Sequence, residues 1–378
     1  MPAIYIAATV RTAVGKAPRG ALASVRPDDL AAVVLRAALD RVPQLDPAEV
    51  EDVILGCAMP EGEQGLNIAR LVVLLADLPD TVAGVTINRF CGSSMQSIHM
   101  AAGAIAMGSG DAFLCGGIES MSRIPMGGFN PLPNPVLRAK SQAYISMGET
   151  AGNLAHKYKI PRERQEKLAV DSHARAAAAQ AAGKFDEEIV PLVAGNQSID
   201  KDGCIRPGTT LEILAGLKPA FAADGTVTAG TSSPLTDGAA CTLVVSEDYA
   251  NAHGLKPLAR IKSTAVAGCP PEIMGIGPVA ATQKALKRAG LGIGDIDIIE
   301  MNEAFAVQAL ACMDELKIDW AKTNLDGGAT AIGHPLGATG ARITGKAAQL
   351  LKREGKQFAL SSQCIGGGQG ITTILEAI

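Results

Sequence analysis

Short apolar runs alternate with amphipathic stretches from the first residues of the chain. Residues 2–9 predict an apolar strand, residues 27–39 a helix that begins at a proline, and residues 49–56 a strand after an acidic turn. Residues 85–88 predict another buried strand, and residues 93–107 predict the helix after it. This alternation predicts a parallel or mixed sheet whose two faces are covered by helices.

The last third of the chain repeats this pattern. Residues 257–264, 279–289 and 294–301 predict a strand, a helix and a second strand, in the same order as in the first third. Residues 111–117, which end in a pair of glycines, likewise parallel residues 357–367. The offset stays near ~250 residues, and a constant offset indicates an internal duplication. We therefore predict two related halves of a layered α/β protein.

The two halves differ after the glycine-rich turn. In the second half the final strand, residues 370–376, comes directly after it, whereas in the first half the matching strand, residues 240–247, comes only after a long stretch. Residues 121–234 are therefore predicted to be an insertion, with a helix over residues 162–182. Its place beside glycine-rich turns makes the insertion a candidate for a domain that covers a substrate.

Length and composition agree with two compact halves. The chain has 378 residues, of which 47% are hydrophobic and 19% charged, values typical of a heavily buried protein. We assign residues 1–120 and 235–257 to an N-terminal half and residues 258–378 to a C-terminal half. The net charge of −4 gives no basic footprint for a nucleic acid.

The eight cysteines show neither paired spacing nor the spacing of a zinc site. Four of them lie in apolar runs and are predicted to be small buried side chains: Cys57, Cys115, Cys241 and Cys312. This usage indicates a reducing, cytoplasmic environment. The start of the chain lacks the charged region and long apolar core of a signal peptide, and no apolar span suggests a transmembrane helix.

Cys91 lies where a predicted strand turns into a predicted helix. At such a helix N-terminus, free N–H groups and the helix dipole favour a thiolate and a developing oxyanion. A cysteine taken alone is more often a buried structural residue. Gly92, Ser93 and Ser94 favour a nucleophile here, because glycine lets the backbone approach a reacting carbon closely.

His334 lies between Gly333 and Pro335, inside the glycine-rich stretch of residues 327–340. Such a turn also resembles a phosphate-binding loop, but the histidine favours acid–base chemistry. Three other histidines are predicted to be solvated: His156, His173 and His253. His99 is predicted to be packed within the helix that follows Cys91.

Cys364 and Asn302 complete the candidate site. Cys364 follows an apolar strand and opens into a run of glycines. Asn302 follows a strand, where its amide could hold a water or an acyl oxygen; a helix N-cap with Glu303 in the first turn is a compatible alternative. Two thiols and an imidazole in such turns indicate covalent acyl chemistry, because a sulfur nucleophile needs a base and an acyl oxygen needs N–H donors.

Four stretches together resemble a known family. Residues 88–94, 302–306, 327–340 and 364–370 are similar, in the same order, to the four signatures of the thiolases. The resemblance spans essentially the whole chain. It implies an α/β fold with a duplicated five-layer αβαβα core and a loop domain inserted in the first half, which agrees with the repeat described above.

The resemblance implies a role for each catalytic position. Cys91 would be the nucleophile that takes the acyl group, and His334 would activate it. His334 would also form one oxyanion hole, together with a water held by Asn302. Cys364 would shuttle a proton to and from the substrate α-carbon and the CoA thiol. The N–H groups of Cys91 and Gly366 would form the second oxyanion hole.

Further positions match the substrate-binding residues of the family. Ser233 matches a serine that contacts the pantetheine, and Arg206 matches a basic position near the nucleotide end of CoA. Met147, Ala304 and Phe305 match positions of the substrate pocket.

Some positions depart from the family pattern without removing a catalytic group. Gly152 replaces the usual Glu, Asp326 stands where a second Asn is common, and Thr330 replaces an aliphatic residue. Ser146 stands where short-chain acetoacetyl-CoA thiolases commonly have His.

The resemblance implies thiolytic cleavage of 3-oxoacyl-CoA by CoA in fatty-acid β-oxidation. The reaction would follow ping-pong chemistry through a Cys91 acyl-enzyme. CoA would be a substrate, and neither a cofactor nor a metal is expected. Acetyl-CoA C-acetyltransferase is the alternative, since it uses the same catalytic set. Cys364 argues against a ketoacyl synthase, and the presence of Cys91 and His334 argues against a non-catalytic thiolase-like lipid carrier. We also expect a homodimer or homotetramer, with docking to a hydratase–dehydrogenase subunit as a further expectation, and no nucleic-acid partner.

Overall fold

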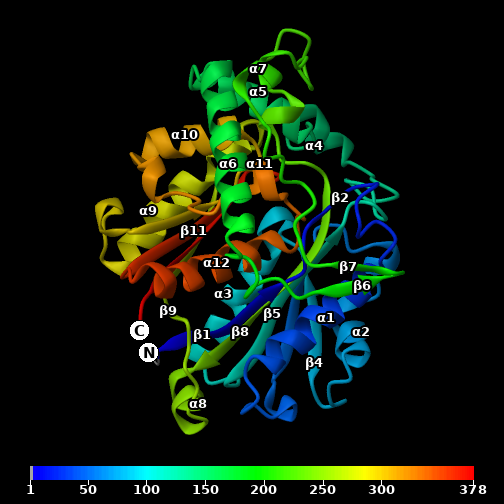
Figure 1. Cartoon of the computed structure of the whole chain (residues 1–378), viewed down its shortest axis with the longest axis vertical. Helices are drawn as coiled ribbons and strands as arrows, with labels where there is room; N and C mark the ends of the chain where they lie inside the picture. Colours follow the sequence, from blue (N-terminus) through cyan, green and yellow to red (C-terminus); the bar gives the residue numbers. More distant parts are fainter. Residues whose placement is uncertain (1–2) are drawn as a thin grey trace.

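The computed structural model describes residues 3–378, and its main sheet consists of two half-sheets joined edge to edge (Figure 1). The first half-sheet has the order β1 (Ile4–Arg11), β8 (Thr236–Ser246), β5 (Ala112–Ser120), β3 (Asp52–Gly56) and β4 (Ala83–Ile87). The second half-sheet has the order β9 (Ala259–Gly268), β12 (Gln369–Glu376), β11 (Phe358–Ile365) and β10 (Ile298–Met301). A short strand, β2 (Gly15–Lys16), pairs with β8.

The two half-sheets share one pattern of strand directions. In the first, β3 and β5 are parallel, while β5 and β8, and β8 and β1, are antiparallel. In the second, β10 and β11 are parallel, while β11 and β12, and β12 and β9, are antiparallel. The halves join where Tyr5 and Ile6 of β1 pair with β9. The shared pattern confirms the internal duplication predicted from the sequence.

Helices form three layers around the strands. The inner layer is α3 (Ser93–Ala106) and α12 (Thr339–Glu354), which pack on each other and on strands of both halves. One outer layer contains α1 (Pro27–Asp40) and α2 (Ile68–Leu75), and the other contains α9 (Gly277–Ala289) and α10 (Ala306–Leu316). The short helices α8 (Glu247–Ala252) and α11 (Ala329–Ile332) lie in connections. The result is the five-layer αβαβα fold that the resemblance to the thiolases implies.

A glycine allows the two inner helices to touch at their N-terminal ends. A Cβ atom on Gly340, in the first turn of α12, would lie 2.2 Å from the backbone nitrogen of Met95 in α3. The Ala341 N–H donates to Ser94 Oγ at 2.8 Å across the same contact. Because Cys91 and His334 directly precede these helices, this contact brings both residues to the same end of the inner layer.

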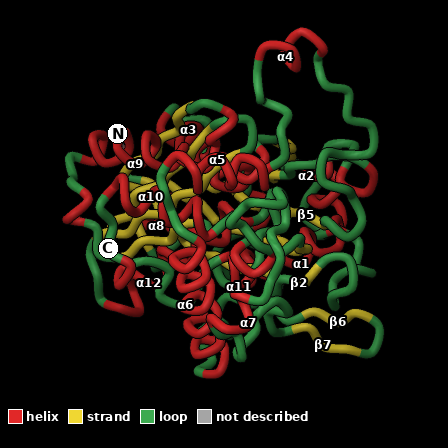
Figure 2. Tube along the Cα trace, turned by 90° about the horizontal axis from the view of Figure 1, so that it is seen from above, coloured by secondary structure: helices red, strands yellow, loops and turns green. Residues whose placement is uncertain are grey.

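The chain between β5 and β8 leaves the sheet and returns to it. Its elements are α4 (Pro135–Lys140), α5 (Met147–Lys157), α6 (Arg162–Ala181), β6 (Leu192–Ala194), β7 (Gln197–Ile199) and α7 (Leu211–Ala215). α5 and α6 pack on α10, and α6 also packs on α11. The segment around α4 projects away from the rest of the molecule (Figure 2).

Most of the predicted helices and strands occur within a few residues of their predicted bounds. Several helices are not predicted, and for two of them the physical cause is plain. α10 is not predicted, because it is buried on nearly every side and lacks a polar face. α12 is not predicted, because it continues the glycine-rich stretch and has two glycines of its own, which disfavour a helix. Residues 85–88 are predicted to be buried, but they belong to β4, an edge strand whose side chains are half-exposed.

The cysteine predictions are confirmed where the structure addresses them. All eight cysteines are free. The four that were predicted to be core residues are fully buried: Cys57, Cys115, Cys241 and Cys312. Within residues 3–378, none of the helices combines the length and the apolar character needed to cross a membrane.

Candidate active site

Cys91 lies on a tight turn between β4 and α3. The turn, Phe90–Gly92, is a single turn of 3₁₀ helix. The side chain of Asn88 fixes its start, because Oδ1 accepts from the Phe90 N–H at 2.8 Å and Nδ2 donates to the Ala58 carbonyl at 3.0 Å. Phe90 has φ = +43°, a left-handed conformation that is strained for an aromatic residue. The turn therefore holds Cys91 in one defined position.

Gly92 lets this turn approach the end of β11. A Cβ atom on Gly92 would lie 2.6 Å from Cδ1 of Ile365, so a larger residue would push the two segments apart. Gln363 of β11 donates from Nε2 to the Cys91 carbonyl. These contacts join the nucleophile turn of the first half to the glycine-rich turn of the second.

The environment of Cys91 favours the neutral thiol. Burial raises the pKa of the Cys91 thiol to about 11, and Glu119 adds to the rise, while N–H groups of Gly366 and of Cys91 itself act in the opposite direction. The helix N-terminus was expected to favour a thiolate; this expectation is wrong for the resting site, because loss of solvation outweighs the hydrogen bonds. A base must therefore remove the proton when Cys91 reacts.

Cys364 lies near Cys91 and is fully buried in β11. Burial raises the pKa of its thiol well above the usual value, and a thiolate at Cys91 would raise it further. The two sulfurs, which come from opposite halves of the duplicated fold, therefore interact electrostatically. Cys364 also belongs to the apolar cluster that contains Phe305 and Met147.

His334 is held by a hydrogen bond to Thr339. Its Nδ1 lies 2.6 Å from Thr339 Oγ1, which donates its own proton to the Pro335 carbonyl at 2.9 Å. Nδ1 must therefore donate, which leaves Nε2 as an unprotonated acceptor, and this buried atom has no partner in the described chain. Burial and the nearby Arg342 lower the pKa of His334 to about 3. The imidazole is therefore a neutral base at physiological pH.

Asn302 offers a free amide at the end of β10. Its side chain is buried, and neither Oδ1 nor Nδ2 has a hydrogen-bond partner within residues 3–378. The backbone N–H of Asn302 donates to the Ser362 carbonyl at 2.9 Å, which ties it to β11. The alternative of a helix N-cap is wrong, since α10 begins at Ala306 with Phe305 as its N-cap. The amide is thus available to a water or a substrate oxygen.

Glu119 is a buried residue that the sequence motifs do not identify. Its carboxylate accepts the backbone N–H groups of Ala58 at 2.8 Å, Met59 at 3.2 Å and Gly337 at 2.9 Å, and the amide of Gln64 at 2.8 Å. Burial raises the pKa of Glu119. The carboxylate connects the loop beneath Cys91 to the loop that carries His334. The sequence feature that could have identified Glu119 is its position as a lone acidic residue at the end of an apolar strand.

Most of the predicted substrate-binding residues gather around Phe305. Ser233 donates to the Ala304 carbonyl from its N–H and from Oγ, both at 3.0 Å. The ring of Phe305 meets Phe221 edge to face, with centroids 5.9 Å apart. Met147 extends toward Gly366, where a Cβ atom would lie 3.5 Å from its Sδ. Met147, Ala304 and Phe305 belong to one apolar cluster with Cys364.

Arg206 makes its hydrogen bonds to His173 of α6. The Arg206 N–H donates to His173 Nδ1 at 3.1 Å, and its guanidinium lies 3.2 Å from Nε2. His173 is buried rather than solvated, so that sequence prediction is wrong; burial, followed by Arg206, lowers the pKa of His173 to about 4. The polar residues around His173 suggest an exposed helix, because the sequence does not show that the segment near residue 206 packs on this histidine.

Comparison with known proteins identifies the family. The model of the thiolase N-terminal domain matches residues 4–248, and that of the thiolase C-terminal domain matches residues 255–377. The chain belongs to the thiolase family. It is 47% identical to a 3-ketoacyl-CoA thiolase of Bacillus subtilis (strain 168) over 100% of both chains. It is also 47% identical to a 3-ketoacyl-CoA thiolase of Aeromonas hydrophila, again over 100% of both.

Solved thiolase structures have the same fold as this chain. The human mitochondrial 3-ketoacyl-CoA thiolase superposes with a TM-score of 0.92 at 40% identity, covering 100% of this chain and 99% of that one. The Bacillus anthracis acetyl-CoA acetyltransferase gives a TM-score of 0.92 at 41% identity, with the same coverage. The duplicated αβαβα architecture is therefore that of the thiolases.

The hydrogen bond of Thr339 to His334 can be tested through the reactivity of Cys91. We expect Thr339→Val to slow alkylation of Cys91 by iodoacetamide roughly tenfold, because an unanchored imidazole is a poorer base for the thiol. Thr339→Ser, which keeps the hydroxyl, should react at close to the rate of the unaltered protein. Rates are read by mass spectrometry of the Cys91 peptide. Equal rates for the valine and serine variants would show that Thr339 does not position the base.

Proposed function

We propose that this thiolase cleaves 3-oxoacyl-CoA with CoA, giving acetyl-CoA and a shortened acyl-CoA. The observation that carries the proposal is the close approach of two buried thiols: the turn of Cys91 contacts Gln363 and Ile365 of the strand that carries Cys364. The full-length similarity to 3-ketoacyl-CoA thiolases supports the same substrate class. This activity makes the protein an acyltransferase that serves the degradation of fatty acids by β-oxidation.

The first half-reaction forms an acyl-enzyme. His334 Nε2 removes the proton of the Cys91 thiol, whose raised pKa keeps it neutral until then. The sulfur attacks the keto carbon, and the bond between the α- and β-carbons breaks. The electron pair leaves on the α-carbon of acetyl-CoA and takes the proton of Cys364. The acyl group stays on Cys91, and Cys364 is left as a thiolate.

The second half-reaction restores the protonation state of both thiols. The Cys364 thiolate removes the proton of the incoming CoA thiol, and the CoA sulfur attacks the thioester carbon on Cys91. The Cys91 sulfur leaves and regains its proton from His334. The high pKa of Cys364, caused chiefly by burial, suits this role, because it makes the thiolate a strong enough base for another thiol.

Two groups of donors would stabilise the oxyanions. In both half-reactions, the N–H groups of Cys91 and Gly366 would receive the oxygen on the carbon bonded to the Cys91 sulfur, since both groups lower the pKa of that thiol. In the first half-reaction, protonated His334 and a water on the free amide of Asn302 would receive the thioester oxygen of the departing acetyl-CoA, which takes up negative charge as the bond to its α-carbon breaks. This assignment is supported by the side chains of His334 and Asn302, because each has a hydrogen-bonding atom without a partner among the described residues.

We propose that residues 121–234 form the cover of the substrate site. Ser233, Met147 and the Phe305–Phe221 pair provide the wall along which the pantetheine and acyl group would lie. Arg206 would contact the nucleotide end of CoA. A cavity of about 580 Å³ between α5 and residues 221–227 continues this region past Phe221, and we propose that it takes the longer acyl chains.

Two cysteine variants separate the proposed roles. Cys91→Ala should form no acyl-enzyme with an acyl-CoA, because no other group is placed as the nucleophile. Cys364→Ala should still acylate Cys91, at least slowly, but its thiolysis should fall by about a thousandfold or more, since no base activates CoA. Mass spectrometry detects the acyl-enzyme, and absorbance of the 3-oxoacyl-CoA follows thiolysis. Acylated Cys91→Ala would exclude Cys91 as nucleophile, and normal thiolysis by Cys364→Ala would exclude its acid–base role.

The acyl-chain range separates the proposal from its alternative. We expect thiolysis across C4 to C16 3-oxoacyl-CoAs. Gly152→Phe should lower kcat/KM for the longest substrates by roughly fivefold or more and leave C4 nearly unchanged, because this part of the cavity wall has open space for a ring. Gly152→Ala is the matched control and should resemble the unaltered enzyme. Activity confined to C4 would favour acetyl-CoA C-acetyltransferase, the activity named for the similar Bacillus anthracis structure.

We also propose that the chain self-associates as a dimer or tetramer. Large apolar side chains are exposed on the projecting segment around α4 (Figure 2): Met126, Phe129, Leu132, Val136 and Tyr144. Such a group is suited to burial against another copy. Light scattering of the purified protein should give at least twice the monomer mass, and a monomer at micromolar concentration would refute self-association.

A further inference from the structure

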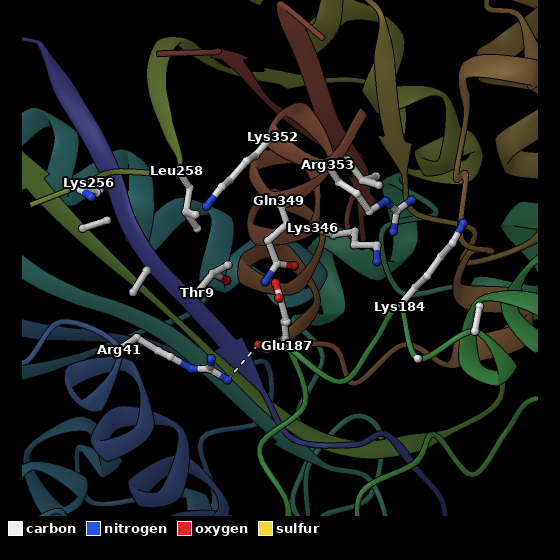
Figure 3. A pocket seen from close by; sticks show the side chains of 15 residues that line it. Thr9, Arg41, Lys184, Glu187, Lys256, Leu258, Lys346, Gln349, Lys352 and Arg353 are labelled. Carbon is white, nitrogen blue, oxygen red and sulfur yellow. Dashed lines mark hydrogen bonds between the residues drawn. The ribbon is translucent and has the colours of Figure 1, made fainter. Parts of the chain in front are cut away.

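A second cavity lies at the far end of α12 from the candidate active site (Figure 3). Its volume is about 670 Å³. The walls come from β1, the C-terminal half of α12, the turn of residues 182–187, and residues 256–258. α12 begins at Thr339, the partner of His334, and rises roughly 20 Å before it reaches Lys352. The cavity is therefore separate from the site of the two cysteines.

The lining of this cavity is strongly cationic. Among its lining residues, Glu187 is the one carboxylate. The cationic side chains come from four separate segments and surround the opening in Figure 3: Arg41, Lys184, Lys256, Lys346, Lys352 and Arg353. A single lysine-rich helix would not produce this arrangement, because the cations come from different elements and meet at one cavity.

Buried carboxylates fix some of these cations in place. Asp326 is almost fully buried and lies 2.6 Å from both Lys346 Nζ and Arg353 Nη1. Lys184 lies 3.8 Å from the same carboxylate, and Lys346 is also 3.3 Å from the buried Glu188. These contacts place the cations of the cavity floor in a defined arrangement before any ligand arrives.

The remaining cations lack a carboxylate partner. Arg41 donates to the backbone carbonyl of Glu187 at 3.0 Å. Lys256 and Lys352 form no ion pair with any carboxylate of residues 3–378. Positive charge therefore exceeds negative charge at the rim, and a concave surface concentrates the resulting field.

We propose that this cavity binds a small polyanion that carries two or more phosphate groups. Its volume falls within the range of small-molecule sites, roughly 300–1,000 Å³. Arginine can hold phosphate oxygens with two N–H groups and lysine adds point charges, so spread cations match several phosphates better than one carboxylate. Ala7, Ala8 and Leu258 form an apolar part of the wall that could receive a base or another organic group.

The test is calorimetric titration of the full chain with inorganic triphosphate and, separately, with ATP. We expect binding that weakens roughly tenfold or more in the double variant Lys256→Gln/Lys352→Gln. The matched control is Lys287→Gln/Lys317→Gln, which removes the same charge from exposed lysines outside the cavity; Lys287 lies in the last turn of α9, as Lys352 does in α12. The control should bind as the unaltered protein does. Tighter binding of ATP than of triphosphate would assign the organic group to the apolar wall, and equal binding would assign the site to phosphate alone.

Three results would overturn the proposal: no binding of either probe, unchanged binding in the cavity variant, or equal weakening in both double variants, which would indicate bulk charge only. Thiolysis of 3-oxoacyl-CoA, measured on the same samples without added polyanion, should be equal in both variants, because neither lysine pair belongs to the candidate active site. The binding result does not depend on thiolysis being observed, so failure of the proposed function and failure of this site are distinguishable.

Discussion

The contact between the N-terminal ends of α3 and α12 determines where the reactive groups of this protein lie. It requires Gly340, since any side chain there would collide with the backbone of Met95. Cys91 lies in the turn before one helix, and His334 lies in the loop before the other. Gly92 makes a second close approach, to Ile365, and brings the Cys91 turn against the strand that carries Cys364. Two glycines thus convert a duplicated scaffold into one site.

Burial then decides the protonation states within that site. Loss of solvation raises the pKa of both thiols and lowers that of the imidazole, so the resting groups are neutral. Because the side chains of the resting site are neutral, binding of an acyl group would not require a charged side chain to lose its hydration. In the proposed reaction, transfer of the Cys91 proton to His334 would be coupled to attack on the substrate, so that the oxyanion and the imidazolium would form together beside the available donors.

Buried ion pairs attach the segment between β5 and β8 to the core. Arg11 of β1 lies 2.7 Å from Asp202 and 3.4 Å from Glu188, both of which belong to that segment. Such pairs contribute little net stability, but removal of one partner would leave an uncompensated charge in the interior, so they favour a single docking position. Glu188 also holds Lys346, which links this attachment to the cationic cavity at the end of α12.

The pattern of the residues alone predicts a duplicated, layered α/β protein and points to the candidate cysteines and histidine, and the resemblance to the thiolases adds the αβαβα order of the layers. Periodic burial leaves a pattern in a strand or a half-buried helix, and reactive residues stand out when glycines surround them. Three features depend on contacts between distant segments and are seen only in the folded chain: the neutral state of Cys91, the Thr339 contact that selects the tautomer of His334, and the link made by Glu119. α12 escaped prediction because close packing of its glycines on α3 and β1, rather than local propensity, makes that stretch a helix. The pKa of a buried group, the tautomer of a histidine and the partners of a buried carboxylate depend on residues that are far away in the chain. Local sequence patterns do not show which distant residues these are.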